Sequence, residues 1–371
     1  MKSTRMKGKM VRTAFLVLAV ACCLCGCAGN EGITVLRTWE VERTGTPDSR
    51  MVFRVGMVTD VQGVHDDSFN WSAWEGLQEL SKATDCNVSY MEPGPEGDYA
   101  RCFRMMAEEG FDLIWGIGFS CAEDLLDAAE QYPGTRFAIV DEAIPQPPDN
   151  VACAVFQAED ASFLVGYIAA SVTKSGKVGF VGGVASEPID QFQYGFQAGA
   201  AWADRERGRE TAVLAEYADS FADAAGGREI ALSMIDQGCD IVYHAAGGTG
   251  LGVIQAAAER GAYAIGADRD QSGLAPKNVL TSALKDVGAV VRQISTDWLA
   301  GGSLGGSTFR FGLREGAVGI PKGHENYSDE LYDAAMRLAD RIVSGEIAPP
   351  VDAESYARFL ESMVERIPVN R

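Results

Sequence analysis

The sequence predicts an α/β protein with two doubly wound parallel sheets. From Phe53 onward, short runs rich in β-branched and aromatic residues alternate with helical patterns. This alternation is typical of βαβ units that build a parallel sheet. Ten such runs are too many for one small sheet, and 371 residues are enough for two lobes of ordinary domain size. We therefore expect two lobes with one sheet in each.

The expected strands and helices follow from these patterns in chain order. The strands are Phe53–Val61, Asn87–Met91, Phe111–Gly118, Arg136–Asp141, Val151–Phe156, Lys177–Val184, Ala212–Tyr217, Asp240–Ala245, Ala262–Asp268 and Val279–Lys285. The helices include Ser68–Ala83, Ala122–Tyr132, Ala161–Thr173, Phe221–Gln237, Gly250–Arg260 and Asp329–Gly345. The first of these helices carries one apolar stripe with a spacing of three residues, formed by Trp71, Trp74, Leu77 and Leu80.

The N-terminal segment is typical of an export signal. An apolar run, Ala14–Leu24, follows the basic residues Lys2, Arg5, Lys7, Lys9 and Arg12. The run is too short to span a bilayer as a mature helix. Its end, Leu24-Cys25-Gly26-Cys27, resembles the lipobox of bacterial lipoproteins. We therefore expect a lipoprotein signal peptide over residues 1–26, lipid on Cys27 and a flexible tether over residues 27–51. An ordinary secretory signal that is cut elsewhere is the alternative.

If this interpretation holds, the globular part works on the extracytoplasmic face of a cell membrane. Removal of residues 1–26 leaves 27 Lys and Arg against 52 Asp and Glu, so the net charge changes from −20 to −25. Such a surface repels phosphate, and we expect no nucleic-acid partner.

The cysteines and histidines indicate neither a metal site nor a cofactor. Five cysteines follow Cys27, show no CxxC spacing and lie in apolar surroundings; they are Cys86, Cys102, Cys121, Cys153 and Cys239. We expect most of them to be small buried apolar side chains, with one disulfide as an alternative. The three histidines have no metal-ligating neighbour at helical spacing.

The first lobe is expected to contain residues 52–158 and 276–305, and the second lobe residues 159–275 and 306–371. Open parallel sheets bind their ligands outside the carboxyl ends of the strands. The residues that directly follow each strand are therefore the candidates for a binding site.

Five segments in a fixed order resemble the basic membrane protein family, which comprises extracytoplasmic substrate-binding lipoproteins of ABC importers and includes purine nucleoside receptors. They are TDVxGxxDxSFNxxAWEGL at Thr59–Leu77, GxGFS at Gly116–Ser120, GKVGFVGG at Gly176–Gly183, DIVYHAAGGTGxGV at Asp240–Val253 and DRDQ at Asp268–Gln271. The resemblance implies a type I periplasmic-binding-protein fold, with a ligand cleft between two lobes joined by a hinge. It also implies that a separate permease and a separate ATPase are partners, that the chain is no enzyme, and that it acts as a monomer.

Two phenylalanines resemble the aromatic walls that hold a base in this family. Phe69 follows a loop at the carboxyl end of the first strand, and Phe192 resembles the opposite wall. Core packing is the alternative for both residues, and Phe196 is an alternative owner of the second role.

Charged residues after the strands suit the polar part of a nucleoside. An ionised Asp only accepts hydrogen bonds, so Asp268 can take two protons from vicinal ribose hydroxyls, and Lys285 can donate to ribose oxygens and balance Asp268. Asp60 and Asp141 resemble sugar and base contacts respectively. Gly248 resembles a backbone N–H donor to the sugar. Turn formation, helix capping and surface salt bridges are the alternatives for these side chains.

The loop before Phe69 departs from the family pattern at one position. The family commonly has Asn-Asp there, whereas this chain has His65-Asp66. A neutral histidine offers its donor and acceptor in a different geometry and can also be protonated. With Asp66 and Asn70, His65 is expected to contact the ligand, and it puts the preference for purines in question.

The leading hypothesis is therefore capture of a nucleoside for import. A sugar or another small polar solute is an alternative ligand, because fold does not settle function. A nucleoside hydrolase is the alternative from another class, but it would need clustered carboxylates around a metal-bound water or a general base.

Overall fold

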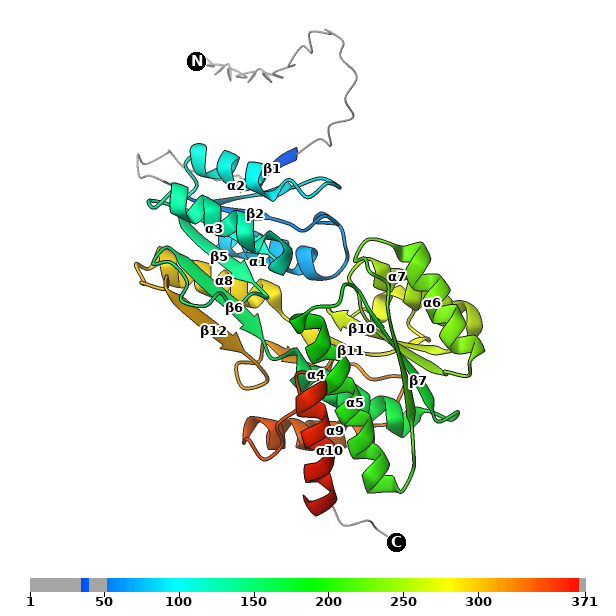
Figure 1. The fold of residues 1–371 in the computed structure, drawn as a ribbon. Helices are drawn as coiled ribbons and strands as arrows, with labels where there is room; N and C mark the ends of the chain where they lie inside the picture. Colours follow the sequence, from blue (N-terminus) through cyan, green and yellow to red (C-terminus); the bar gives the residue numbers. More distant parts are fainter. Residues whose placement is uncertain (1–34, 40–51, 367–371) are drawn as a thin grey trace, which may run out of the picture. The chain divides into compact units, whose positions relative to one another are not determined.

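Two mostly parallel sheets form the framework of the protein (Figure 1). The structure is a computed structural model that describes residues 35–39 and 52–366, all within one compact unit. The first sheet has the order β1-β3-β2-β4-β5-β6-β12, in which β1 alone runs antiparallel to its neighbour. The second sheet has the order β13-β11-β10-β9-β7-β8, in which β13 is the antiparallel edge strand.

The strands of the first sheet are β1 Val35–Trp39, β2 Phe53–Val58, β3 Cys86–Glu92, β4 Leu113–Ile117, β5 Arg136–Val140, β6 Val151–Phe156 and β12 Ser307–Phe311. Those of the second sheet are β7 Lys177–Gly182, β8 Ala212–Tyr217, β9 Ile241–Ala245, β10 Tyr263–Asp268, β11 Val279–Lys285 and β13 Val318–Gly319. The helices are α1 Phe69–Ala83, α2 Tyr99–Glu108, α3 Ala122–Gln131, α4 Ala158–Val172, α5 Glu187–Arg207, α6 Ala224–Asp236, α7 Thr249–Arg260, α8 Val287–Leu299, α9 Asp329–Val343 and α10 Ala353–Arg366. Two short 3₁₀ turns are η1 Phe119–Cys121 and η2 Ser272–Leu274.

Helices cover both faces of each sheet. In the first lobe α1 packs against α8, and α2 packs against α3. In the second lobe α4 packs against α5, while α6 packs against α7. The central strands between these layers are almost fully buried, as their continuous apolar runs require, whereas the edge strands β8 and β12 are partly exposed. A buried hydrogen bond from Trp115 Nε1 to Ser295 Oγ, 3.0 Å long, ties β4 to α8.

The predicted fold class is confirmed, and most predicted strands lie within one or two residues of the observed ones. The bounds of β6, β8 and β11 are those expected from the sequence. The sequence analysis did not anticipate β1, β12 or β13. Five residues of the expected tether, Val35–Trp39, form the edge strand β1. The signal peptide and Cys27 lie outside the described residues.

The distribution of the C-terminal segments between the lobes differs from the expectation. β11 was placed in the first lobe, but it pairs in parallel with β10 in the second sheet. β12 was placed in the second lobe, but it pairs in parallel with β6 in the first sheet. Of the segment 276–305, helix α8 lies against α1, and the loop after it approaches Asp149 of the first lobe through Gly305. Strand pairing depends on residues that are distant in the sequence, so the local pattern of a strand does not indicate which strand it pairs with.

The chain therefore crosses between the sheets three times. The crossings follow β6, β11 and β12, and each is a short connection of a few residues. Backbone hydrogen bonds from Gln157 N–H to the Phe311 carbonyl and from Asp286 N–H to the Ala317 carbonyl join these connections to one another. Such connections are the elements that absorb the backbone rotation when two lobes close around a ligand.

Helices α1 and α8 approach each other through two glycines. A methyl group added at Gly76 would lie 2.2 Å from the carbonyl oxygen of Gly288, and one added at Gly288 would lie 2.4 Å from that of Ser72. We expect Gly76→Ala to force these helices apart and to lower the free energy of unfolding by about 1–3 kcal/mol. Gly134→Ala is the control, because no atom lies within 4 Å of a methyl group there. Equal denaturation midpoints for the two variants would contradict this account of the packing.

Candidate ligand-binding site

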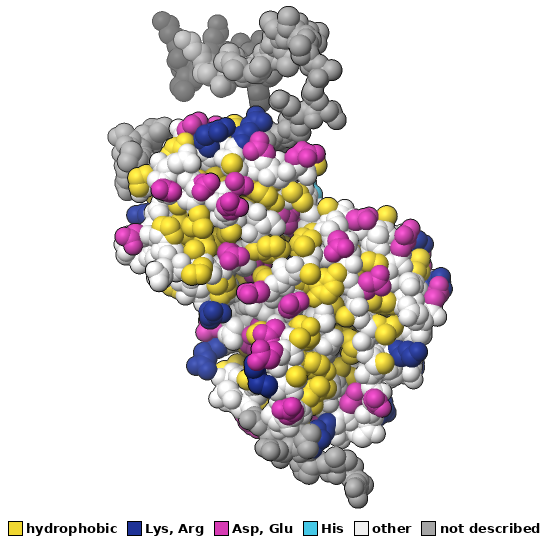
Figure 2. Space-filling view, viewed as in Figure 1, with side chains coloured by type: hydrophobic (Ala, Val, Ile, Leu, Met, Phe, Trp, Pro, Cys, Tyr) yellow, Lys and Arg dark blue, Asp and Glu magenta, His cyan; other side chains and the backbone are white. Residues whose placement is uncertain are grey.

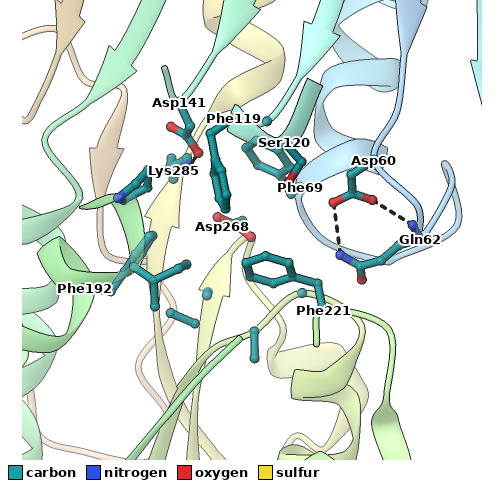
Figure 3. Close-up of a pocket in the computed structure, with 17 residues that line it drawn as sticks. Asp60, Gln62, Phe69, Phe119, Ser120, Asp141, Phe192, Phe221, Asp268 and Lys285 are labelled. Carbon is teal, nitrogen blue, oxygen red and sulfur yellow. Dashed lines mark hydrogen bonds and ion pairs between the residues drawn. The ribbon is translucent and has the colours of Figure 1, made fainter. Parts of the chain in front are cut away.

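A pocket lies where the carboxyl ends of the two sheets face each other (Figure 3). The space between its lining atoms is about 550 Å³, including the part that opens to solvent. In each sheet the strand order reverses beside the first strand of the lobe, β2 or β7, and such switch points are where α/β sheets bind ligands. The pocket is lined by Asp60, Gln62, Phe69, Gly118, Phe119, Ser120, Asp141, Pro188, Ile189, Phe192, Phe221, Ala245, Ala246, Gly247, Ala267, Asp268 and Lys285.

Four phenylalanines dominate the apolar part of the lining. Phe69 begins α1 and Phe119 begins η1 in the first lobe, whereas Phe192 comes from α5 and Phe221 from the loop before α6 in the second lobe. The rings of Phe119 and Phe221 meet edge to face across the lobes, with centroids 6.4 Å apart. Aromatic rings from both lobes therefore surround the same space, which suits a flat, partly apolar ligand.

A buried ion pair crosses the pocket between the lobes. Lys285, the last residue of β11, pairs through Nζ with the carboxylate of Asp141, which directly follows β5. Their side chains are only 4% and 10% exposed. The ammonium also lies 4.7 Å from the ring centroid of Phe69 and 5.5 Å from that of Phe192, within the range of a cation–π contact. The ammonium of Lys285 therefore contacts the rings of Phe69 and Phe192 and the carboxylate of Asp141 at the same time.

The Asp268 carboxylate is partly buried and lies at the centre of the pocket (Figure 3). It accepts a hydrogen bond of 2.5 Å from the hydroxyl of Ser68, which precedes α1 in the other lobe. Burial raises its pKa above the usual range, and the nearby ammonium of Lys285 partly opposes this shift. The backbone of Asp268 has a φ of +64°, a conformation that is unusual for a residue with a side chain. Strained residues cluster at binding sites, so this backbone is consistent with a functional role.

Asp60 is held in a network with its own loop. Its carboxylate accepts hydrogen bonds from the backbone N–H and the side-chain amide of Gln62, at 2.9 and 3.2 Å, and from Asn70 Nδ2 at 2.9 Å. Burial raises the pKa of Asp60 to about 6, against the lowering effect of these hydrogen bonds. Gln62 Oε1 in turn accepts the backbone N–H of Gly248 at 2.6 Å, so this amide links the two lobes.

Asp66 serves the start of α1 and does not line the pocket. Its carboxylate accepts three backbone N–H groups, from Ser68 at 3.0 Å, Asn70 at 2.7 Å and Trp71 at 3.0 Å, and also Asn70 Nδ2 at 3.0 Å. Unpaired N–H groups at a helix start are commonly satisfied in this way. Burial raises the pKa of Asp66.

Six of the ten ligand-binding residues expected from the sequence line the pocket together: Asp60, Phe69, Asp141, Phe192, Asp268 and Lys285. The other four lie elsewhere. His65 is exposed, with its ring 5.8 Å from that of Trp71, so the expected contact with a base edge has no support from its position. Asp66 and Asn70 hold the loop, and the N–H of Gly248 is already bonded to Gln62. Phe196 is fully buried in the core against Tyr243.

One expectation about pairing is refined by the structure. Lys285 was expected to balance Asp268, and its charge does oppose the burial that raises the pKa of that carboxyl, but its direct ion-pair partner is Asp141. The sequence analysis missed Phe119, Phe221 and Gln62 as lining residues. Phe119 stands in the GxGFS segment, so its place after a strand could have indicated it. Phe221 follows β8, which ends at Tyr217, so its place after a strand could also have indicated it.

The described residues contain no group of three or more His, Cys, Asp or Glu side chains that could hold a metal ion. The five cysteines that follow the tether are all buried, as expected, and Cys102, Cys121, Cys153 and Cys239 are free thiols. In the part of the chain that the structure covers, no helix is both long and apolar enough to cross a membrane.

Two α/β lobes with a pocket between the ends of their sheets are the architecture of solute-binding proteins of the periplasmic-binding-protein type. Comparison with known proteins identifies the family. The family model described as "ABC transporter substrate-binding protein PnrA-like" (Bmp) matches residues 53–353. The chain therefore belongs to the Bmp family of substrate-binding proteins of ABC transporters.

The relatives agree with this assignment. The CD4+ T-cell-stimulating antigen of Listeria innocua is 37% identical over 330 residues, which cover 83% of this chain and 91% of that protein. Basic membrane protein A of Borreliella burgdorferi is 36% identical over 317 residues, which cover 84% and 91%. A solved ABC transporter solute-binding protein from Aeropyrum pernix K1 superposes with a TM-score of 0.74 at 27% identity, covering 85% of this chain and 97% of that one.

The contact between Gln62 and Gly248 should help to keep the ligand-free lobes together. A hydrogen bond of this kind contributes about 1 kcal/mol, or roughly a fivefold change in an equilibrium constant. We expect Gln62→Ala to shift the ligand-free protein toward an open form with a larger radius of gyration in small-angle X-ray scattering. Gln131→Ala, at the exposed end of α3, is the matched control. A radius of gyration equal to that of the control would show that this hydrogen bond does not hold the lobes.

Proposed function

We propose that the protein captures a nucleoside, preferably one with a purine base, and presents it to an ABC importer. The observation that carries this proposal is the combination in one pocket of four phenylalanines with the partly buried carboxylate of Asp268 and a buried ion pair. The aromatic part suits the base, and the charged part suits the sugar.

The base would lie against the phenylalanine rings. A base has a π face, and stacking on an aromatic side chain contributes about 1–3 kcal/mol per base. Phe69 and Phe192 were expected to form the walls, and Phe119 and Phe221 lie close enough to share this role. A bare sugar would leave most of this aromatic surface in contact with water.

The ribose would lie against Asp268. A carboxylate only accepts hydrogen bonds, and its two oxygens can take the protons of two vicinal hydroxyls. Asp268 Oδ2 already accepts a hydrogen bond from Ser68, and the second lone pair of this oxygen stays available for a ribose hydroxyl. Lys285 has three donors, of which the ion pair with Asp141 uses one, so it can also donate to a sugar oxygen.

The place of work would be the extracytoplasmic face of the cell membrane, with Cys27 as the lipid anchor. The basic membrane proteins among the relatives are consistent with a membrane-associated protein outside the cytoplasm. Binding would be coupled to closure of the lobes, which the permease would recognise, and a separate ATPase would supply the energy.

We expect Asp268→Ala to weaken the binding of a purine nucleoside by a factor of about 100 or more, because two hydrogen bonds to a charged acceptor would be lost. Isothermal titration of adenosine, guanosine and inosine measures this loss. Asp270→Ala is the matched control, since Asp270 is exposed and does not line the pocket. Equal nucleoside affinities for the two variants would remove Asp268 from the site.

Phe69→Ala separates a stacked base from a bound sugar. We expect it to weaken nucleosides by about tenfold to a hundredfold, which corresponds to the loss of one stacking contact. Free ribose has no base to stack, so its affinity should stay nearly constant. A sugar-binding protein would show the same loss for both ligands or a preference for the sugar.

The anchor is tested separately by Cys27→Ser. We expect this variant to lose incorporation of labelled palmitate and to leave the detergent phase in a Triton X-114 partition. Cys25→Ser keeps the expected attachment site and is the control. Palmitate that remains on the Cys27→Ser protein would show that the anchor lies elsewhere or that the leader is an ordinary secretory signal.

A further inference from the structure

Two buried polar side chains lie beside the pocket without lining it, and one of them is hydrogen-bonded to the lining residue Ala267. His244 is the fourth residue of β9 and has no exposed surface, and Gln271 follows β10 and is 3% exposed. His244 Nε2 lies 3.0 Å from Gln271 Oε1. Neither His244 Nδ1 nor Gln271 Nε2 has a hydrogen-bond partner among the described residues. A buried polar pair that leaves two atoms unsatisfied is costly and calls for an explanation.

The direction of the hydrogen bond between them can be assigned. Gln271 Oε1 also accepts the backbone N–H of Ala267, at 3.1 Å, and only the amide oxygen can accept from a backbone N–H. His244 must therefore donate from Nε2, and its Nδ1 carries no proton. A neutral ring fits its surroundings, because burial lowers the pKa of His244 to about 4. Gly250 of α7 lies directly against the ring, where a methyl group would come within 2.0 Å of Nδ1.

Gln271 connects this pair to Asp268. Its side chain holds the N–H of Ala267, the residue before Asp268, and its own backbone N–H donates to Ser282 Oγ on β11 at 3.2 Å. A second backbone hydrogen bond, from Arg269 N–H to the Ala267 carbonyl, closes a tight turn with Asp268 at its centre. Asp268 has its strained φ of +64° within this turn.

We propose that His244 and Gln271 are positioning residues for ligand binding, which act by holding the turn that aims the Asp268 carboxylate into the pocket. His244 fixes the amide of Gln271, and the amide fixes the backbone beside Asp268. This role rests on the proposed function, because it requires that Asp268 binds the ligand. The unsatisfied His244 Nδ1 and Gln271 Nε2 atoms lower the stability of the protein, and this loss is tolerated because the pair holds the Asp268 carboxylate in position.

A double-mutant cycle between Gln271 and Asp268 tests this role. Gln271→Met keeps the length of the side chain but removes the acceptor, and Asp268→Asn removes the charge. With the purine nucleoside that binds most tightly among adenosine, guanosine and inosine, we expect Gln271→Met to weaken binding about tenfold in the wild-type background. In the Asp268→Asn background the same change should have almost no effect, since its target is already altered. The free base of that nucleoside should bind both Gln271 forms equally.

Four further measurements keep the result interpretable. Gln255→Met makes the same substitution at an exposed site on α7 and should bind like the wild type. Gln271→Glu restores the acceptor and should recover most of the affinity. If Gln271→Met does not fold, as judged by thermal unfolding, His244→Asn is used in the same cycle, with an expected loss of about threefold. The side-chain ¹⁵N spectrum of His244 should show the proton on Nε2 in the wild type.

The outcomes separate this inference from the function on which it rests. Equal losses from Gln271→Met in both backgrounds, or an unchanged affinity, would overturn the positioning role while Asp268 remained a binding residue. Nucleoside binding that is unaffected by Asp268→Asn alone would overturn the binding site itself, and the positioning role with it. A proton on Nδ1 of His244 would contradict the assigned hydrogen bond.

Discussion

The buried ion pair between Lys285 and Asp141 is the interaction on which the arrangement of the pocket depends. A buried charge without a partner is strongly destabilising, so each residue requires the other to be in place. Asp141 belongs to the first lobe and Lys285 to the second, so the pair joins the two lobes. The same ammonium faces the rings of Phe69 and Phe192, so Lys285 holds the charged and the aromatic lining residues in position relative to each other. Removal of the Lys285 ammonium would leave the Asp141 carboxylate buried without a partner, and Phe69 and Phe192 would lose their shared cation–π contact.

The two lobes bring equivalent positions to this pocket. Leaving out the edge strands β1, β12 and β13, both sheets have the same doubly wound order, and β5 of the first corresponds to β10 of the second. Asp141 follows β5 and Asp268 ends β10, and both have a positive φ, of +62° and +64°. The next strands, β6 and β11, end at Phe156 and Lys285, whose ammonium lies 5.3 Å from the Phe156 ring. The sequence shows no internal repeat, so the equivalence lies in the topology. In each lobe, the end of the corresponding strand places a carboxylate with a strained backbone in the pocket.

The sequence predicted the fold class and much of the pocket, for a physical reason. Buried parallel strands leave apolar runs that are readable locally, and polar residues just after such runs must lie at one edge of the sheet. This reasoning, joined to the family resemblance, brought Asp60, Asp141, Asp268 and Lys285 to the same place. It could not assign β11 and β12 to their sheets, because partners are chosen over long distances. It also could not foresee that Gln62 bonds the N–H of Gly248, or that His65 turns outward beside Trp71, since both depend on the path of a loop.

The central claim is that this pocket recognises a base and a ribose together. The most direct measurement is the melting temperature of mature protein that has been unfolded and refolded to remove any bound ligand, with nucleosides, free bases, ribose and hexoses added in turn. A ligand at a hundred times its dissociation constant adds about 2.7 kcal/mol of stability. The account predicts a clear upward shift with purine nucleosides and a much smaller one with free bases or ribose, which bind more weakly. A shift with sugars alone, or no shift with any nucleoside, would contradict it and leave the fold and the family as the conclusions that stand.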